Sequence, residues 1–319
     1  MKLGKIGLVK ALPERIEQRN NFLRQSQWHE WDILTEIGDA SARKYYRLGK
    51  GNRSVILMDA DPRICGSSSD FIGIAAILRS ANISAPEVYK YDLIQGFLII
   101  EDLGTHTYAN WIMHKPSEEV QLFLHANKVI ETAQTIQTDL SLKILTPEYA
   151  AAITTPFWDN YAPEQKEEGI SILKEALDLV DTNKPVFCFR DFHAENLIWR
   201  ATHSGLSKTG VLDFQDAHLA HPIYDIVSIL RDARRDINPV TFKHVSMLWN
   251  DKGFDFDTTF SVYSVQRNLR ILGIFCNLIE RQNKQKYRAY LSRVAGYLHQ
   301  DIQHPVLSDL NKLIGSKIS

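Results

Sequence analysis

The feature that most constrains the fold is a change of hydrophobic periodicity near residue 103. Before it, between residues 31 and 100, short runs of β-branched and aromatic residues are separated by Gly-containing turns, which predicts antiparallel strands. After it, apolar residues recur at helical spacing almost to the C-terminus. We therefore expect an α+β protein with two lobes: a strand-rich N-terminal lobe, residues 1–103, and a larger helical lobe, residues 104–319.

The same periodicity places the individual elements. In the N-terminal lobe it predicts strands over 31–37, 44–48, 53–58, 89–91 and 96–100, and helices over 13–28 and 69–80. In the helical lobe it predicts helices over 117–140, 162–180, 224–234, 238–250, 258–280 and 284–300. Three short strands, 185–189, 197–199 and 209–212, interrupt this helical part.

Composition narrows the class of protein. The 319 residues are 44% hydrophobic, as in ordinary globular domains, and a net charge of −1 gives no general attraction to nucleic acid or anionic membranes. The three cysteines are widely spaced and lack a zinc-binding pattern, which indicates reduced thiols. The chain has neither a signal-peptide pattern nor an apolar run of transmembrane length. We expect a soluble cytoplasmic protein without a nucleic-acid or membrane partner.

Three polar residues follow short apolar strands in the order that phosphoryl transfer requires. Asp191 and Asn196 stand five positions apart, and Asp213 follows the next strand. A carboxylate can accept the proton of an attacking hydroxyl, while amide and carboxylate oxygens are ligands that Mg²⁺ prefers. The alternative is that Asp191 is a turn residue and Asp213 a helix cap. Their positions at strand ends favour an ATP-dependent small-molecule kinase.

The order of elements resembles the protein-kinase-like fold, and the motif around Asp191 resembles the aminoglycoside phosphotransferase family. Longer segments are similar to the bacterial N-acetylmuramate/N-acetylglucosamine anomeric kinases of peptidoglycan recycling. These segments are 38–47, 55–60, 190–193, 212–217, 224–228 and 266–275. The resemblance implies transfer of phosphate from ATP (or GTP), with Mg²⁺, to the anomeric hydroxyl of an N-acetylated amino sugar.

The resemblance also implies a role for individual positions. Asp191 would be the catalytic base, and Asn196 and Asp213 would bind Mg²⁺. The implied nucleotide-binding residues are Gly38, Ser41, Arg43 and Lys44 over the phosphates, and Glu101, Asp102 and Leu103 at the adenine.

The chain departs from the kinase pattern at the phosphate-binding lysine. Met58 stands where kinases place that Lys, and the helix over 71–80 lacks the Glu that would pair with it. Something else must then neutralise the phosphates, and Arg43 and Lys44 are the candidates. The alternative is that both are solvated charges at the edge of a strand.

Two polar residues near the catalytic loop have open alternatives. His193 either reaches the substrate or is a hydrogen-bonded loop histidine. Asp216 either binds sugar hydroxyls or caps a turn.

For other residues around the loop we predict structural or acceptor-binding roles. Phe189 replaces the usual His and should brace the loop by packing, and Asp225 should brace it through backbone N–H groups. Arg231 and Arg234 either contact an acceptor carboxylate or lie at the surface. Arg267 should brace the lobe or form a wall of the substrate site.

Two other functions compete with the sugar-kinase interpretation. One is phosphorylation of another small alcohol, such as choline, homoserine or an aminoglycoside, whose positive charge would require an acidic pocket. The other is a nucleotide-binding pseudokinase, which Met58 favours and the complete set of Asp191, Asn196 and Asp213 opposes. A protein kinase is disfavoured, because no activation segment follows Asp213.

Overall fold

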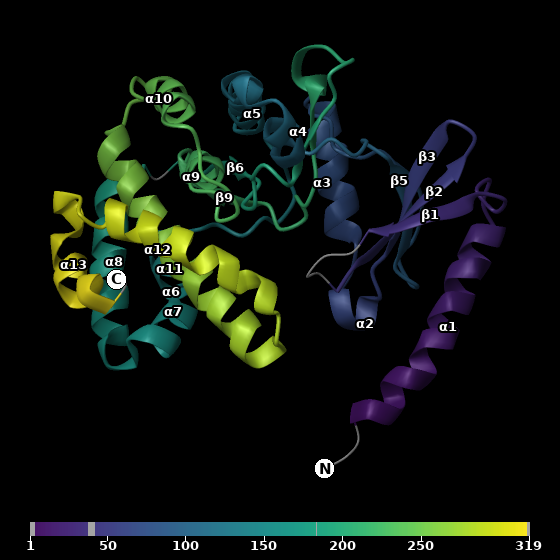
Figure 1. Ribbon diagram of the computed structural model, residues 1–319, viewed down its shortest axis with the longest axis horizontal. Coiled ribbons are helices and arrows are strands. Elements are labelled where there is room, and N and C mark those ends of the chain that lie inside the picture. Colours follow the sequence, from purple (N-terminus) through teal and green to yellow (C-terminus); the bar gives the residue numbers. More distant parts are fainter. Residues whose placement is uncertain (1–3, 38–41, 183, 318–319) are drawn as a thin grey trace. The chain divides into compact units, whose positions relative to one another are not determined.

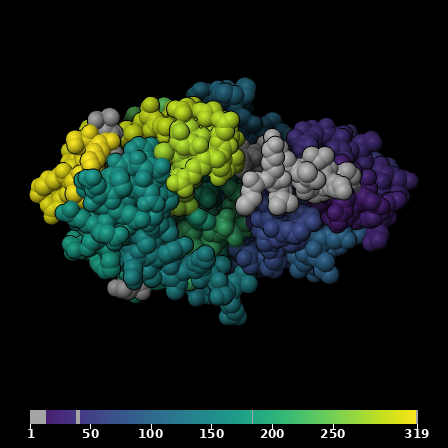
Figure 2. Space-filling view, turned by 90° about the horizontal axis from the view of Figure 1, so that it is seen from below, coloured from purple at the N-terminus to yellow at the C-terminus, as the bar shows by residue number. Residues whose placement is uncertain are grey.

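The chain divides into two compact units. The computed structural model describes residues 4–37, 42–182 and 184–317 (Figure 1), with side chains from Glu14 onward (Figure 2). The smaller unit comprises residues 1–105 and 210–215, and the larger comprises residues 106–209 and 216–319. The division expected from the sequence, at residues 103 and 104, left out the return of residues 210–215 to the smaller unit.

The smaller unit is built on a five-stranded antiparallel sheet of order β1-β2-β3-β5-β4 (Figure 1). Every strand that the sequence predicted for this unit is confirmed within two residues. Its strands are β1 (Asp32–Ile37), β2 (Lys44–Lys50), β3 (Arg53–Asp59), β4 (Val88–Asp92) and β5 (Phe97–Glu101). Alternate residues of the central strands, including Leu48, Leu57 and Ile99, are buried in one apolar cluster with Phe22 and Leu23.

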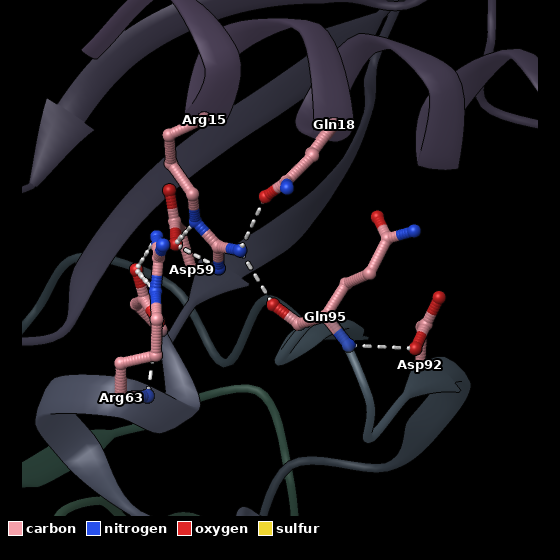
Figure 3. Close-up of polar contacts among 7 residues, drawn as sticks. Arg15, Gln18, Asp59, Arg63, Asp92 and Gln95 are labelled. Carbon is pink, nitrogen blue, oxygen red and sulfur yellow. Dashed lines mark hydrogen bonds and ion pairs between the residues drawn. The ribbon is translucent and has the colours of Figure 1, made fainter. Parts of the chain in front are cut away.

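The first helix, α1 (Gly4–Arg24), is held against this sheet by one arginine. Arg15 Nε donates to Asp59 Oδ1 at 2.8 Å, and its Nη1 donates to the Gln95 carbonyl at 2.6 Å (Figure 3). The same guanidinium lies 3.8 Å from the centre of the Phe97 ring. Asp59 is the last residue of β3, so the buried carboxylate at the end of this strand has its counter-charge within the smaller unit.

Two further helices complete the smaller unit, α2 (Pro62–Cys65) and α3 (Ser69–Ser80). The bounds of α3 are those that the sequence predicted, and its buried face consists of Phe71, Ile74, Ala75 and Leu78, at helical spacing. The returning segment is anchored here, because Val211 N–H donates to the Ser84 carbonyl at 2.8 Å. In addition, Phe214 stacks on Phe71 with ring centres 4.9 Å apart.

The larger unit is mostly helical, as expected. Its helices are α4 (Tyr108–His114), α5 (Glu119–Ala133), α6 (Pro147–Ala152), α7 (Thr155–Tyr161), α8 (Lys166–Val180), α9 (Tyr224–Leu230), α10 (Pro239–Met247), α11 (Phe256–Gln282), α12 (Arg288–Asp301) and α13 (Ser308–Ile314). Short strands β6 (Val186–Cys188) and β9 (His218–Ala220) pair antiparallel. Strand β7 (Leu197–Trp199) is followed along the chain by a turn and then by β8 (Thr209–Val211). Among the described helices, none has both the length and the apolar character to cross a membrane.

Helix α11 lies at the centre of this unit and carries an unusual number of buried polar residues. Gly273 permits the start of α7 to approach closely, because a Cβ there would lie 2.1 Å from the Phe157 nitrogen. Buried polar side chains on α11 include Ser264, Gln266, Arg267, Asn268 and Arg270. Polar groups are rarely so concentrated in a core unless they are paired or bind something.

Candidate active site

The loop that follows β6 is held by the carboxylate of Asp225. Both backbone N–H groups at its start donate to this side chain, Phe189 to Oδ2 at 2.7 Å and Arg190 to Oδ1 at 3.0 Å. Burial raises the pKa of Asp225 to about 7, although these two donors act to lower it. The prediction that Asp225 braces the catalytic loop through backbone N–H groups is confirmed.

The peptide after Arg190 is strained and is clamped from the other side as well. Arg190 has a φ of +77°, a left-handed conformation that is unusual for a long side chain. Its carbonyl accepts from Arg267 Nη1 at 3.1 Å. Such strain persists only when neighbouring groups fix it, and it is common at functional sites. The role of Arg267 as a brace is therefore confirmed.

Phe189 supports the loop by packing, as predicted. Its side chain is 1% exposed, stacks on Phe192 with ring centres 4.8 Å apart, and meets the edge of Phe187 at 5.4 Å. The ring therefore replaces a hydrogen-bonding His with aromatic contacts.

Asp191 follows this strained residue and carries a partly exposed carboxylate. Its Oδ1 lies 3.9 Å from Arg267 Nη2, and 34% of the side chain is exposed. Burial acts to raise the pKa of Asp191, but nearby positive charge outweighs it and holds that pKa below its ordinary value. The charges come from Arg267, Arg270 and Arg190. An ionised carboxylate that reaches solvent at the tip of a fixed loop can accept a proton.

Asn196 lies on the same loop and is oriented by two contacts. Its Nδ2 donates to the Asp191 carbonyl at 2.9 Å and lies 3.2 Å from His193 Nε2. Arg234 Nη1 lies 3.1 Å from the same His193 nitrogen. Since both neighbours are donors, Nε2 accepts and the ring proton is on Nδ1.

His193 is therefore a neutral, hydrogen-bonded loop histidine. Burial, reinforced by the charge of Arg234, lowers its pKa to about 4. The ring orients the Asn196 amide. Of the two roles considered for His193, this is the structural one. Substrate contact by His193 stays a prediction.

Asp216 belongs to the larger unit and is exposed. Its Oδ1 lies 3.6 Å from Arg190 Nη1. Contact between Asp216 and sugar hydroxyls stays a prediction.

The smaller unit contains Asp213, directly after β8. Its φ is +57°, which Asp tolerates better than most residues. Gln215 Nε2 donates to Asp213 Oδ1 at 2.7 Å, and the buried ring of Phe214 fixes the backbone between them. The carboxylate itself is exposed.

Arg43 is near Asp213 within the smaller unit. Burial raises the pKa of Tyr45 to about 12, while the charge of Arg43 lowers it and that of Asp213 raises it. Both charges therefore act on one hydroxyl at the start of β2. Lys44 is exposed there, and Met58 is fully buried in β3.

Gly38 and Ser41, the other two residues implied to cover the phosphates, lie outside the described residues.

The segment after β5 is fixed by its own acidic side chains. Arg47 donates through Nε to Asp102 Oδ2 at 2.7 Å, and the Gly104 N–H donates to Asp102 Oδ1 at 3.0 Å. Glu101 pairs with Arg79 Nη1 at 3.2 Å, and Leu103 is buried. These carboxylates fix the conformation of the segment. Contact between its backbone and adenine stays a prediction.

Two arginines on the larger unit differ from what the sequence led us to expect. Arg231 is not at the surface, because it is 6% exposed and binds Asp301 through two hydrogen bonds. Arg270 had no expected role, yet its charge acts on Asp191. The sequence held one indication of this role: Arg270 stands three positions after Arg267 on the same predicted helix.

Comparison with known proteins agrees with this geometry. The sequence profile of the phosphotransferase enzyme family matches residues 33–244, more than half of the chain. A curated relative from Caulobacter vibrioides, named N-acetylmuramate/N-acetylglucosamine kinase, is 29% identical over 86% of this chain and 88% of its own length.

Two solved structures share the fold. A choline/ethanolamine kinase family protein from Mesorhizobium loti has a TM-score of 0.62 at 12% identity, covering 94% of this chain and 99% of its own. A thermostable mutant of an aminoglycoside phosphotransferase, in ternary complex with AMP-PNP and hygromycin B, has a TM-score of 0.61 at 14% identity, covering 89% and 99%. The protein-kinase-like architecture expected from the sequence is confirmed. With the family profile spanning both units, the chain belongs to the phosphotransferase enzyme family.

Proposed function

We propose that this phosphotransferase uses ATP and Mg²⁺ to phosphorylate the anomeric hydroxyl of N-acetylmuramate and N-acetylglucosamine. The observation that carries the proposal is the doubly clamped loop, which presents an ionised Asp191 beside an oriented Asn196. The name of the Caulobacter vibrioides relative supports the choice of acceptor.

Asp191 would orient the acceptor hydroxyl and take its proton. An anomeric hydroxyl is more acidic than an ordinary alcohol, so a base with a lowered pKa is sufficient for a late proton transfer. Most of the rate would come from positioning and from neutralising charge on the transferred phosphoryl group. The clamped peptide of Arg190 serves this positioning, because it fixes the residue that precedes the base.

Asn196 of the larger unit and Asp213 of the smaller unit would each supply an oxygen ligand to Mg²⁺. The Asn196 amide uses its Nδ2 on the Asp191 carbonyl, which turns Oδ1 to the opposite side of the group. The Asp213 carboxylate is exposed and accepts a hydrogen bond from a neutral side chain, Gln215. Both supply hard oxygen atoms. Mg²⁺ bound by them would neutralise charge on the nucleotide phosphates.

Arg43 would replace the missing lysine on the nucleotide side. Met58 is fully buried among apolar residues, so that position supplies no charge. Arg43 is half-buried at the start of β2, and its charge acts on the same tyrosine as that of Asp213. A guanidinium can grip phosphate oxygens through two hydrogen bonds.

The charge around Asp191 weighs against choline or an aminoglycoside as acceptor. A cationic acceptor would need an excess of carboxylates, whereas three arginines act on Asp191. The pseudokinase alternative has no use for a strained, clamped loop that presents an ionised base.

The test is ATP consumption by the purified protein with Mg²⁺ and a panel of acceptors: N-acetylmuramate, N-acetylglucosamine, glucose, choline, homoserine and kanamycin. We expect turnover with the two N-acetyl sugars, and its loss when the anomeric hydroxyl is methylated or Mg²⁺ is chelated. GTP replaces ATP in a parallel series. Turnover of choline, homoserine or kanamycin alone would replace the sugar as acceptor, and ATP binding without turnover would favour the pseudokinase.

A further inference from the structure

Arg270 is a buried cation without a bonded partner among the residues that the structure describes. It lies three residues after Arg267 on α11, so both side chains project from the same face of the helix. The residue is 8% exposed, yet its guanidinium makes no hydrogen bond or ion pair with any residue that the structure describes. Arg267, in contrast, donates to the Arg190 carbonyl and lies 3.9 Å from Asp191.

The groups around Arg270 do not compensate its charge. Asp191 is the carboxylate that acts on it, and that carboxylate is already shared with Arg267 and Arg190. The other group that acts on Arg270 in the same direction is the phenol of Tyr224, which is not a carboxylate.

The remaining neighbours add little negative charge. Burial lowers the pKa of His218 to about 3, so this ring is neutral. Asp216 is exposed beside Arg190, and the Asp225 oxygens are occupied by two backbone N–H groups. Positive charge is therefore in excess around Asp191.

An isolated guanidinium in a buried position costs stability unless a ligand supplies its counter-charge. Burial accordingly lowers the pKa of Arg270. Two anions enter a sugar kinase, the nucleotide phosphates and any carboxylate on the acceptor. The phosphates bring Mg²⁺ with them and have Arg43 as their proposed protein cation, whereas an acceptor carboxylate brings no cation. The carboxylate is therefore the anion for which no cation has yet been assigned.

We propose that Arg270 binds the carboxylate of an acidic amino-sugar acceptor and thereby makes the enzyme prefer N-acetylmuramate to the neutral N-acetylglucosamine. A planar guanidinium matches a carboxylate through two parallel hydrogen bonds. This inference rests on the proposed function, whose acceptor it specifies.

The experiment compares kcat/KM for N-acetylmuramate, its neutral methyl ester and N-acetylglucosamine. The variants are Arg270→Gln and Arg270→Lys, with Arg281→Gln as a control, since Arg281 is exposed near the end of the same helix. Wild type should prefer the acid to its ester by about ten- to a hundred-fold, as expected for a hydrogen-bonded charge pair. Arg270→Gln should remove most of that preference, Arg270→Lys part of it, and Arg281→Gln none.

Melting temperatures separate this role from a structural one. Arg270 is bonded to no described residue and its buried charge costs stability, so ligand-free Arg270→Gln should melt at or above the wild-type temperature. A clear drop would mean that Arg270 holds the structure together.

Two other outcomes are distinct. An equal loss of kcat/KM for all three acceptors in Arg270→Gln would overturn the inference, because Arg270 would then act on the transferred phosphoryl group or on Asp191. Failure of the wild-type chain to phosphorylate either sugar would defeat the proposed function, and this inference with it.

Discussion

Two buried arginines of the larger unit have opposite surroundings. Arg231 donates to Asp301 through Nε at 2.8 Å and Nη2 at 2.6 Å, and three aromatic rings lie 5.0 to 5.1 Å from its guanidinium. Arg270 is buried to nearly the same extent and makes no comparable bond within the described chain. The first has its counter-charge in the protein, whereas the described residues supply none that is bonded to the second.

The difference separates the structural frame, the residues that hold the helices in place, from the functional site. A buried ion pair that is complete within the chain fixes one arrangement of helices, here α9 against α12. A buried charge that is incomplete indicates a ligand. The carboxylates follow the same division. Both oxygens of Asp225 receive backbone N–H groups, whereas the Asp191 carboxylate has, among the described residues, only an arginine at 3.9 Å. Four substitutions, in order of decreasing effect, test this division.

Asp191→Asn tests the site side of the comparison most strongly. An amide cannot accept the acceptor proton, so kcat should fall by about 10²- to 10⁴-fold, the usual contribution of a general base. The melting temperature should hardly change, because Asp191 accepts no hydrogen bond at its carboxylate in the described structure. Initial rates and circular dichroism melts measure the two quantities. Substantial residual turnover would remove Asp191 from the role of base.

Asp301→Ala tests the frame side. It leaves the Arg231 charge buried and unpaired, which should lower the free energy of unfolding by about 3–5 kcal/mol. The matched control is Asp309→Ala, which removes an exposed pair with Lys312 and should cost less than about 1 kcal/mol. Urea denaturation gives both values. Equal losses in the two variants would show that the Arg231–Asp301 pair does not hold the frame.

Arg43→Ala extends the comparison to the smaller unit. If Arg43 contributes the charge-assisted bonds that a lysine supplies in kinases, ATP affinity should weaken by about ten- to a hundred-fold. Lys44→Ala, at the exposed neighbouring position, should have a smaller effect. Calorimetric titration with ATP and Mg²⁺ measures both. Unchanged nucleotide affinity and turnover would mean that Arg43 is a solvated charge at the edge of the strand.

Asp225→Asn probes the clamp on the catalytic loop. The amide can accept only one of the two N–H groups, so the variant should be less stable by about 1–3 kcal/mol at pH 5. The folded pKa of about 7 exceeds that of an unfolded Asp, so wild type binds the extra proton when folded and loses stability as pH rises through 7.

The variant has no carboxylate to bind this proton. The difference in unfolding free energy between wild type and variant should therefore narrow between pH 5 and pH 8. A difference that stays constant over this range would mean that Asp225 is ionised throughout. Urea denaturation at several pH values decides between the two.

Local pattern was sufficient for much of the fold. The bounds of α3 were predicted because Phe71, Ile74 and Leu78 repeat at helical spacing. The hairpin was predicted because the Gly-containing turn at 49–52 separates two strand-like runs. The helix expected over 117–140 was wrong at both ends. A 3₁₀ turn at Pro116–Glu118 precedes α5, and the helix ends at Ala133, because the later apolar residues belong to another segment.

Short elements escaped prediction for a physical reason. Helices α4, α6, α7 and α13 have six or seven residues, fewer than two turns, so their apolar residues cannot display a period. Strand β9 has three residues and exists through its pairing with β6.

The site was partly predictable. Asp191, Asn196 and Asp213 could be singled out because the chemistry requires those types in that order. Arg231 and Arg270 could not be told apart, because both are arginines within segments that the sequence predicts to be helical. Whether such a charge is paired depends on a residue far along the chain, here Asp301, which only the tertiary structure supplies.

The most direct test of the proposed activity is to locate the phosphate on the product. N-acetylmuramate is incubated with the protein, ATP and Mg²⁺, and the mixture is examined by phosphorus–proton correlation NMR. The account predicts a new phosphorus signal that correlates with the anomeric proton of the sugar. Correlation with the methylene protons at C6, or ADP formation without any phosphorylated sugar, would contradict it.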